Sequence, residues 1–139
     1  MGNVRTETEQ RSQETLGDEH ALQIRLLGAL EQALQNGADR AAIDDLFEQL
    51  ISFTDAHFMS EGLLMRLHAY PEYEAHMEEH DQLITEIRTI QEIYSVDDSN
   101  DAVGHLGKLT PWVMRHMMTK DRAFEDFLKG DVAQTPMPV

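Results

Sequence analysis

Apolar side chains recur at three- and four-residue intervals in four successive stretches of this 139-residue chain. That period places them on one face of a helix, and no segment shows the strict alternation of a half-buried strand. The stretches cover residues 16–34, 43–64, 73–94 and 112–128. Because short connections make consecutive helices antiparallel neighbours, we predict an all-α, up-down-up-down four-helix bundle.

Turn-forming residues separate these stretches. Gly37 follows Asn36 and suits the left-handed position that ends a helix. Pro71 disfavours helical geometry in Tyr70, so the second helix should end before it. Segment 97–100 offers Asp and Ser side chains that cap the next helix. We therefore expect a short connection at each of these three places.

The start of the fourth helix has two interpretations. Thr110 and Pro111 would serve as N-cap and first helical residue in a short helix. In a longer helix, the chain becomes helical near Asp101 and kinks at Pro111, where Gly107 has no side chain to obstruct the adjustment. We favour the kinked helix because it matches the third helix in length. Gly130 is expected to end it.

The two ends of the chain differ in composition from its middle. Residues 1–15 carry one apolar side chain besides the initiator methionine, and we expect a flexible polar arm there. Residues 16–130 form the bundle, and residues 131–139, with two prolines, form a short extended tail. The N-terminus has no apolar run of the signal-peptide kind, and no stretch reaches the length of a membrane span.

Charge and cysteine content narrow the function. The chain has 11 Lys and Arg against 26 Asp and Glu, for a formal net charge of −15. Nucleic-acid backbones and anionic membrane surfaces repel such a polyanion, so we expect neither as a partner. The absence of cysteine excludes disulfides, thiolate metal ligands and thiol nucleophiles. It also fits a reducing compartment, and we expect a cytoplasmic protein.

Histidines and carboxylates recur at ligand spacing on the predicted helices. His57 and Glu61 lie four residues apart, which puts both on one helix face, about one turn apart. His76 and His80 have the same spacing, and in an antiparallel hairpin the two pairs lie at equal height, since both are centred on the second connection. The first and third connections extend this layer to seven residues. They are His20, His57, Glu61, His76, His80, His116 and Asp121.

This layer points to metal ions. Taken singly, each histidine is more often a hydrogen-bonded core or surface residue than a ligand. Together, five imidazoles and two carboxylates in one small core would carry a heavy desolvation cost without a cation. Nitrogen and oxygen ligands without sulfur suit iron or manganese, and zinc or copper less well. Seven ligands exceed the roughly four that one zinc takes, so we expect two ions. Two octahedral ions with bridging carboxylates and a bridging oxygen leave one position open for a small diatomic ligand.

In order and spacing, the seven residues resemble the ligand series of the hemerythrin family, in its bacterial branch. The likeness covers about residues 16–128 and includes the motifs Tyr70-Pro71-x-Tyr73 and Trp112-x-x-x-His116. Di-iron bundles of the ferritin type need Glu-x-x-His motifs, which this sequence lacks.

The resemblance implies two iron ions joined by an oxo or hydroxo bridge, with dioxygen binding at the iron that has only two histidines. His76, His80 and His116 would hold one iron, His20 and His57 the other, and Glu61 and Asp121 would bridge them. Four side chains beside these ligands are expected to line the oxygen pocket: Ile24, Phe58, Val113 and Met117.

Three functions share such a centre. The leading hypothesis is an oxygen carrier or store. The first alternative is a sensor module, in which oxygen or redox state changes the contacts to a partner protein or output domain. The second is a di-iron peroxidase or oxidase, which the lack of an obvious acid–base residue in the predicted pocket disfavours.

Asp121 poses a geometric problem, because it follows His116 by five residues. In a regular α-helix that spacing turns the side chain about 140° away. Either the carboxylate approaches the metal pair from the flank with local widening of the helix, or a π-type turn between Met117 and Asp121 rotates it inward. We favour the flank approach.

Several residues are set aside. His68 and His105 each lie eleven residues from a ligand histidine, so roughly 16 Å along a helix axis, and should be outside the centre. The acidic residues after Pro71, including Glu79, are expected to form a solvated face. The methionines expected to fill gaps in the core are Met59, Met77, Met114, Met117 and Met118.

Overall fold

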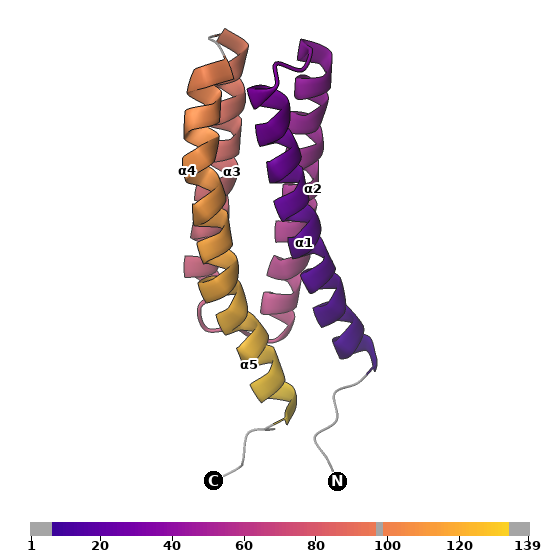
Figure 1. Ribbon diagram of the computed structural model, residues 1–139. Helices are drawn as coiled ribbons and strands as arrows, with labels where there is room; N and C mark the ends of the chain where they lie inside the picture. The colour runs from indigo at the N-terminus through magenta and orange to yellow at the C-terminus, as the bar shows by residue number, and fades with distance from the viewer. Residues whose placement is uncertain (1–6, 97–98, 134–139) are drawn as a thin grey trace.

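The computed structural model describes residues 7–96 and 99–133, and all regular structure within these ranges is helical. The four helices of the bundle pack side by side along its length, as predicted (Figure 1). A π-helical turn, η1, continues α4 into α5, so these three elements form one long fourth rod. The helices are α1 (Glu7–Gln35), α2 (Arg40–Leu67), α3 (Tyr73–Val96), α4 (Ser99–His116), η1 (Met117–Asp121) and α5 (Arg122–Ala133).

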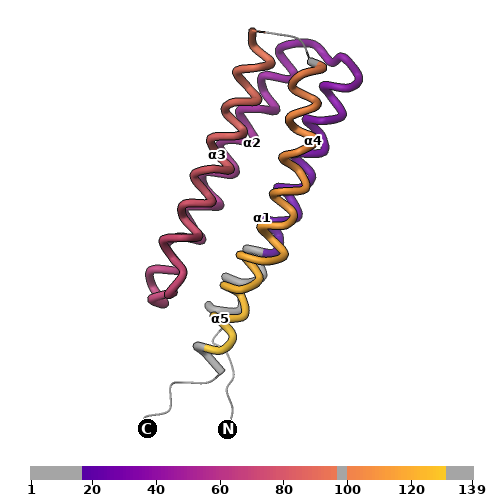
Figure 2. Tube along the Cα trace, turned by 90° about the vertical axis from the view of Figure 1, so that its left-hand side faces the viewer, coloured from indigo at the N-terminus to yellow at the C-terminus, as the bar shows by residue number. Residues whose placement is uncertain are grey.

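Each helix packs against the helices that precede and follow it, and the last packs against the first. Helix α1 contacts α2 and α4, while α3 contacts α2 and α4. Helix α5 extends beyond the α2–α3 connection (Figures 1 and 2). Within the described ranges, no helix combines the length and apolar character that crossing a membrane requires.

Local signals in the sequence determine the connections. Gly37 has φ +68°, the left-handed conformation predicted for it. Asp39 caps α2, where its carboxylate accepts a hydrogen bond of 3.0 Å from the backbone N–H of Ala42. Ala69 has φ +51° just after α2 and directly before Tyr70. Of the capping segment predicted at residues 97–100, residues 97 and 98 lie outside the described residues, and α4 begins at Ser99.

Helix α1 begins earlier than predicted, at Glu7 instead of Leu16. Residues 7–15 contain no glycine or proline and consist mainly of Glu, Gln, Thr and Arg. Such residues extend a helix without an apolar stripe, and acidic side chains near the start suit the helix dipole. The arm predicted for residues 1–15 is therefore helical from Glu7, and its first six residues lie outside the described ranges.

The last helix also departs from its predicted ends. Helix α4 is continuous through Pro111, which confirms the longer of the two interpretations. Helix α5 passes through Gly130 and ends at Ala133, because one helical glycine costs only about 1 kcal/mol and does not force a stop. The predicted tail, 131–139, is helical for its first three residues, and the rest lies outside the described residues.

Two apolar clusters fill the bundle, with a polar layer between them. In α2, His57 and Glu61 stand between Ile51 of the larger cluster and Met65 of the smaller one. Burying each large apolar side chain contributes about 1.5–3 kcal/mol, so both clusters hold the layer in place. The smaller cluster consists of Met65, Tyr70, Phe124 and Leu128. The larger cluster includes Leu27, Leu30, Phe47, Leu50, Ile51, Leu83, Ile87, Ile90, Leu106, Leu109 and Val113.

Candidate metal centre

Seven polar side chains meet in the layer between the clusters, and they are the seven that the spacing predicts. Their nitrogen and oxygen atoms form two groups, and within each group the atoms lie within 4.8 Å of one another. All are buried except His20, which is partly exposed. The first group is Glu61, His76, His80, His116 and Asp121, and the second is His20, His57, Glu61 and Asp121.

Glu61 turns one oxygen towards each group. Its Oε1 lies 3.0 Å from Nε2 of both His76 and His80. Its Oε2 faces the second group, 3.8 Å from Nε2 of His20. Gly62 beside it lets α2 approach α3 closely, because a Cβ there would stand 3.2 Å from Sδ of Met77.

Asp121 divides its oxygens in the same way. Oδ1 lies 2.9 Å from Nε2 of His76 and 3.1 Å from Nε2 of His116. Oδ2 lies 3.0 Å from Nε2 of His20. Both carboxylates therefore connect the two groups, which is the geometry of a bridging ligand.

The π-helical turn η1 brings Asp121 inward. The N–H of Arg122 reaches the carbonyl of Met117, five residues back, as a π-helix requires. This wider turn aligns residues five apart, so Asp121 lies on the same side as His116. The flank approach that we favoured from the sequence is wrong, and the inward rotation by a π-type turn is what the structure adopts.

Two glutamates orient imidazoles of the layer. Nδ1 of His57 donates to Glu19 at 2.6 Å, and Nδ1 of His116 donates to Glu79 at 2.5 Å. With its proton on Nδ1, each ring presents the lone pair of Nε2 to the layer, the arrangement usual for histidines that bind metals. Glu19 is not among the site residues that the spacing predicts, and the prediction of a solvated Glu79 is wrong.

A shared signal marks both glutamates. Each directly precedes a histidine of the layer, in Glu19-His20 and Glu79-His80. Successive residues of a helix are rotated by about 100° around its axis. The glutamate therefore points towards the adjacent helix, while the histidine that follows it points into the core. The histidine that each acid reaches therefore belongs to the next helix of the bundle.

Unpaired nitrogens show that the layer fits a cation. Nε2 of four histidines is buried without a hydrogen-bond partner among the described residues. In three of these rings a carboxylate oxygen lies 3.0–3.1 Å from Nε2 without forming a hydrogen bond to it. Each unpaired buried group destabilises the fold by about 1–3 kcal/mol, whereas a metal ion between the rings would satisfy them. The four are His20, His57, His80 and His116.

The electrostatics of the layer agree with this. Burial opposes protonation of His20, but Asp121 and Glu61 outweigh it and raise its pKa to about 10. The same balance raises the pKa of His76 to about 9. Burial works against ionisation of Glu61, but the adjacent imidazoles of His20, His76 and His80 outweigh it and lower its pKa to about 2. Burial lowers the pKa of His80. The two buried carboxylates are thus stabilised in their ionised form by adjacent positive charge, which either protonated histidines or metal ions supply.

The residues expected to line the pocket adjoin the layer. The ring of Phe58 stacks on His80 with centroids 3.6 Å apart, and its centroid is 5.9 Å from that of His57. Val113 is buried in the larger cluster. Ile24 and Met117 are partly buried against the same cluster. Their role in an oxygen pocket stays a prediction.

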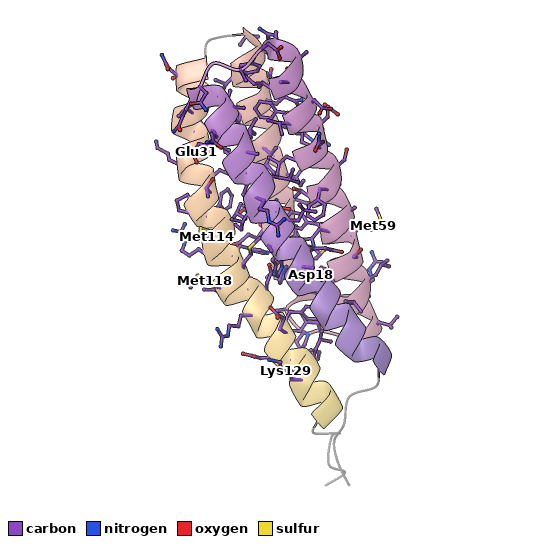
Figure 3. All side chains as sticks on the ribbon, turned by 45° about the vertical axis from the view of Figure 1, so that its right-hand side comes forward. Asp18, Glu31, Met59, Met114, Met118 and Lys129 are labelled. Atoms are coloured by element: carbon purple, nitrogen blue, oxygen red, sulfur yellow. The ribbon has the colours of Figure 1, made fainter. Side chains whose placement is uncertain are left out.

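Residues set aside from the centre lie outside it, with one correction. His68 follows the end of α2, and His105 is 45% exposed, 3.8 Å from Glu86. Met59 and Met118 are 68% and 70% exposed and project from the bundle surface, so the prediction of core packing is wrong for them (Figure 3). Met114 is also exposed, at 45%, because these three lie on outward helix faces.

Comparison with known proteins gives the family. The model of the family described as "Hemerythrin HHE cation binding domain" matches residues 11–128. The bacteriohemerythrin of Stenotrophomonas maltophilia (strain R551-3) is 25% identical over 122 residues, which cover 87% of this chain and 78% of that protein. Bacteriohemerythrins of Pseudomonas paraeruginosa (strain DSM 24068 / PA7) and Pseudomonas aeruginosa (strain LESB58) are 24% identical with the same coverage. No solved structure matches the chain. With its family match over most of its length and a polar layer that fits two cations, this chain belongs to the hemerythrin family of HHE cation-binding domains.

Proposed function

We propose that this protein binds dioxygen reversibly at a non-haem di-iron centre and acts as an oxygen carrier or store. The observation that carries the proposal is the unequal division of histidines between two groups that share both carboxylates. One group contains three imidazoles and the other only His20 and His57. Two ions of equal coordination number would differ by one ligand, so the ion beside His20 and His57 keeps an open position.

The side chains of this chain have distinct tasks in the proposal. Glu61 and Asp121 would hold both ions, since each turns one oxygen towards each group. Glu19 and Glu79 fix the orientation of the rings they contact. When bound, the iron pair supplies the electrons that hold dioxygen and recovers them when dioxygen leaves.

Exclusion of water distinguishes carriage from the alternatives. Phe58 packs flat against His80, and Val113 belongs to the larger cluster that borders the layer. An apolar wall of this kind slows the entry of water and protons, which would promote loss of the bound oxygen as peroxide and leave the iron oxidised. We include a cytoplasmic location in the proposal, since a chain without cysteine needs no oxidising compartment.

The test is repeated oxygenation. Iron-loaded protein is reduced without air, exposed to oxygen and then flushed with argon while its absorption spectrum is followed. Reversible spectra over many cycles, with slow autoxidation, are the expected result. Phe58→Ala and Val113→Ala should speed autoxidation, whereas Met118→Ala, at a 70% exposed position, should not. Irreversible oxidation in the first cycle would contradict carriage and favour the sensor or the oxidase.

A further inference from the structure

A buried polar pair lies next to the two-histidine group. Gln23 stands three residues after His20 in α1, and Thr54 stands three residues before His57 in α2. Nε2 of Gln23 donates a hydrogen bond of 2.8 Å to Oγ1 of Thr54. Because α1 and α2 are antiparallel, the pair occupies the adjacent level of the bundle, roughly 4.5 Å along the axis from the two histidines.

Most buried polar side chains in the described part of the chain belong to the metal centre. Gln23 and Thr54 are the two that do not, and they are 2% and 0% exposed. Their neighbours within α1 and α2 that face the core are apolar, among them Leu27 and Leu50. The larger cluster alone gives no reason for an amide and a hydroxyl at this level.

The pair is also incompletely satisfied. Oε1 of Gln23 is buried and has no hydrogen-bond partner among the described residues. An unpaired buried acceptor destabilises the fold, and a leucine would fill a similar volume without that penalty. Stability therefore does not explain the glutamine, whereas a ligand that pairs with its free end does.

We propose that Gln23, held in place by Thr54, hydrogen-bonds the small ligand that occupies the open position beside His20 and His57. The inference rests on the proposed function and adds one polar contact to an otherwise apolar pocket. The amide presents its oxygen to a protonated ligand or, turned by 180°, its NH₂ group to an anion, and the hydroxyl of Thr54 accepts or donates accordingly. Gln23 is thus a specificity-determining residue for the ligand.

The test uses azide as an anionic probe of the open position in oxidised, iron-loaded protein. The double variant Gln23→Leu/Thr54→Val removes both partners and leaves no unpaired hydroxyl. We expect azide to bind about tenfold more weakly, as for the loss of one hydrogen bond to a charged group. Iron content should be unchanged, and the thermal midpoint of unfolding should stay equal or rise because an unpaired buried acceptor is gone.

Two further variants make the result specific. Thr54→Ser keeps the hydroxyl and should retain the azide affinity of the unmodified protein. Gln91→Leu removes a comparable side-chain hydrogen bond, 3.2 Å to Glu48, about 16 Å along α3 from His80, and should also leave azide affinity unchanged.

Three outcomes would overturn the inference. Unchanged azide affinity in the iron-loaded double variant would exclude the hydrogen bond. A lowered midpoint with unchanged azide affinity would make the pair part of the core only. Loss of iron from the double variant would assign the pair to holding the metal. If the unmodified protein takes up no iron, the proposed function itself fails and the inference falls with it.

Discussion

The carboxylate of Glu79 in α3 accepts a hydrogen bond of 2.5 Å from Nδ1 of His116 in α4. A corresponding bond of 2.6 Å joins Glu19 in α1 to Nδ1 of His57 in α2. The α1–α2 and α3–α4 hairpins thus repeat one arrangement, in which a glutamate of the first helix orients an imidazole of the second. One oriented ring belongs to each of the two groups.

Removing either glutamate should weaken metal binding. In Glu79→Ala and Glu19→Ala the ring loses the acceptor that fixes its orientation, and we expect metal affinity to fall about 10- to 100-fold. Competition with a chelator of known affinity measures this. Glu78→Ala, at the exposed neighbouring position, is the matched control. Equal affinities for Glu78→Ala and Glu79→Ala would show that the hydrogen bond has no part in holding metal.

The bridging carboxylates should matter more than any histidine outside the layer. Glu61→Ala and Asp121→Ala each remove an oxygen donor from both groups, so we expect iron occupancy to drop in both variants. His68→Ala and His105→Ala change residues that lie outside both groups and should keep full occupancy. Elemental analysis of the four proteins, purified in parallel, is the measurement. Equal iron retention in all four would contradict the assignment of the bridges.

The position of the seven-residue layer could be predicted because it depends on few quantities. A helix repeats every 3.6 residues, and a turn fixes which residues of two antiparallel helices lie at equal height. Gly37 and Pro71 located the turns, so the heights of residues such as His57 and His80 followed. Errors of one or two residues in a turn do not move a residue to another level of the bundle.

Other features of the structure depend on interactions that the spacing of apolar residues along the sequence does not report. The polar composition of residues 7–15 predicts exposure to solvent, but it does not tell a flexible arm from an exposed helix. The start of α1 at Glu7 therefore could not be predicted from the apolar pattern. The hydrogen bond from His116 to Glu79 crosses between helices, and its geometry depends on side-chain rotation. A π-helical turn such as η1 costs some backbone energy, and the attraction of Asp121 to the histidines offsets that cost. Periodicity reports neither energy, so it could not decide between η1 and the flank approach.

Protein stripped of metal should lose stability in alkaline solution. Burial lowers and the adjacent carboxylates raise the pKa of His20, which reaches about 10 in the fold against an ordinary value of 6.5. A raised pKa contributes stability that is complete below 6.5 and is lost as pH rises through 10. Urea unfolding measured between pH 6.5 and pH 10 should give a free energy of unfolding that falls as pH rises. The fall should be smaller in His20→Gln, which lacks the titrating imidazole. A free energy that rises with pH would contradict this charge assignment.

Two glycines should respond to alanine in opposite directions. Gly28 lies within α1, and a Cβ there would meet no atom within 4 Å, so Gly28→Ala should stabilise the protein by about 0.5–1 kcal/mol. Gly37 has φ +68°, where alanine is strained by about 1–2 kcal/mol, so Gly37→Ala should destabilise it. The midpoints of urea unfolding of Gly28→Ala and Gly37→Ala, each compared with that of the unmodified protein, measure the two effects. Changes of the same sign would contradict the helix and turn assignments.

The metal content of the protein tests the central claim most directly. Five imidazoles and two carboxylates in two groups with shared bridges predict about two iron ions per chain. Iron is measured by elemental analysis in protein expressed with sufficient iron and purified without chelators, and related to protein concentration from amino-acid analysis. A ratio close to two supports a dinuclear centre. A ratio of one or less in fully folded protein would contradict it.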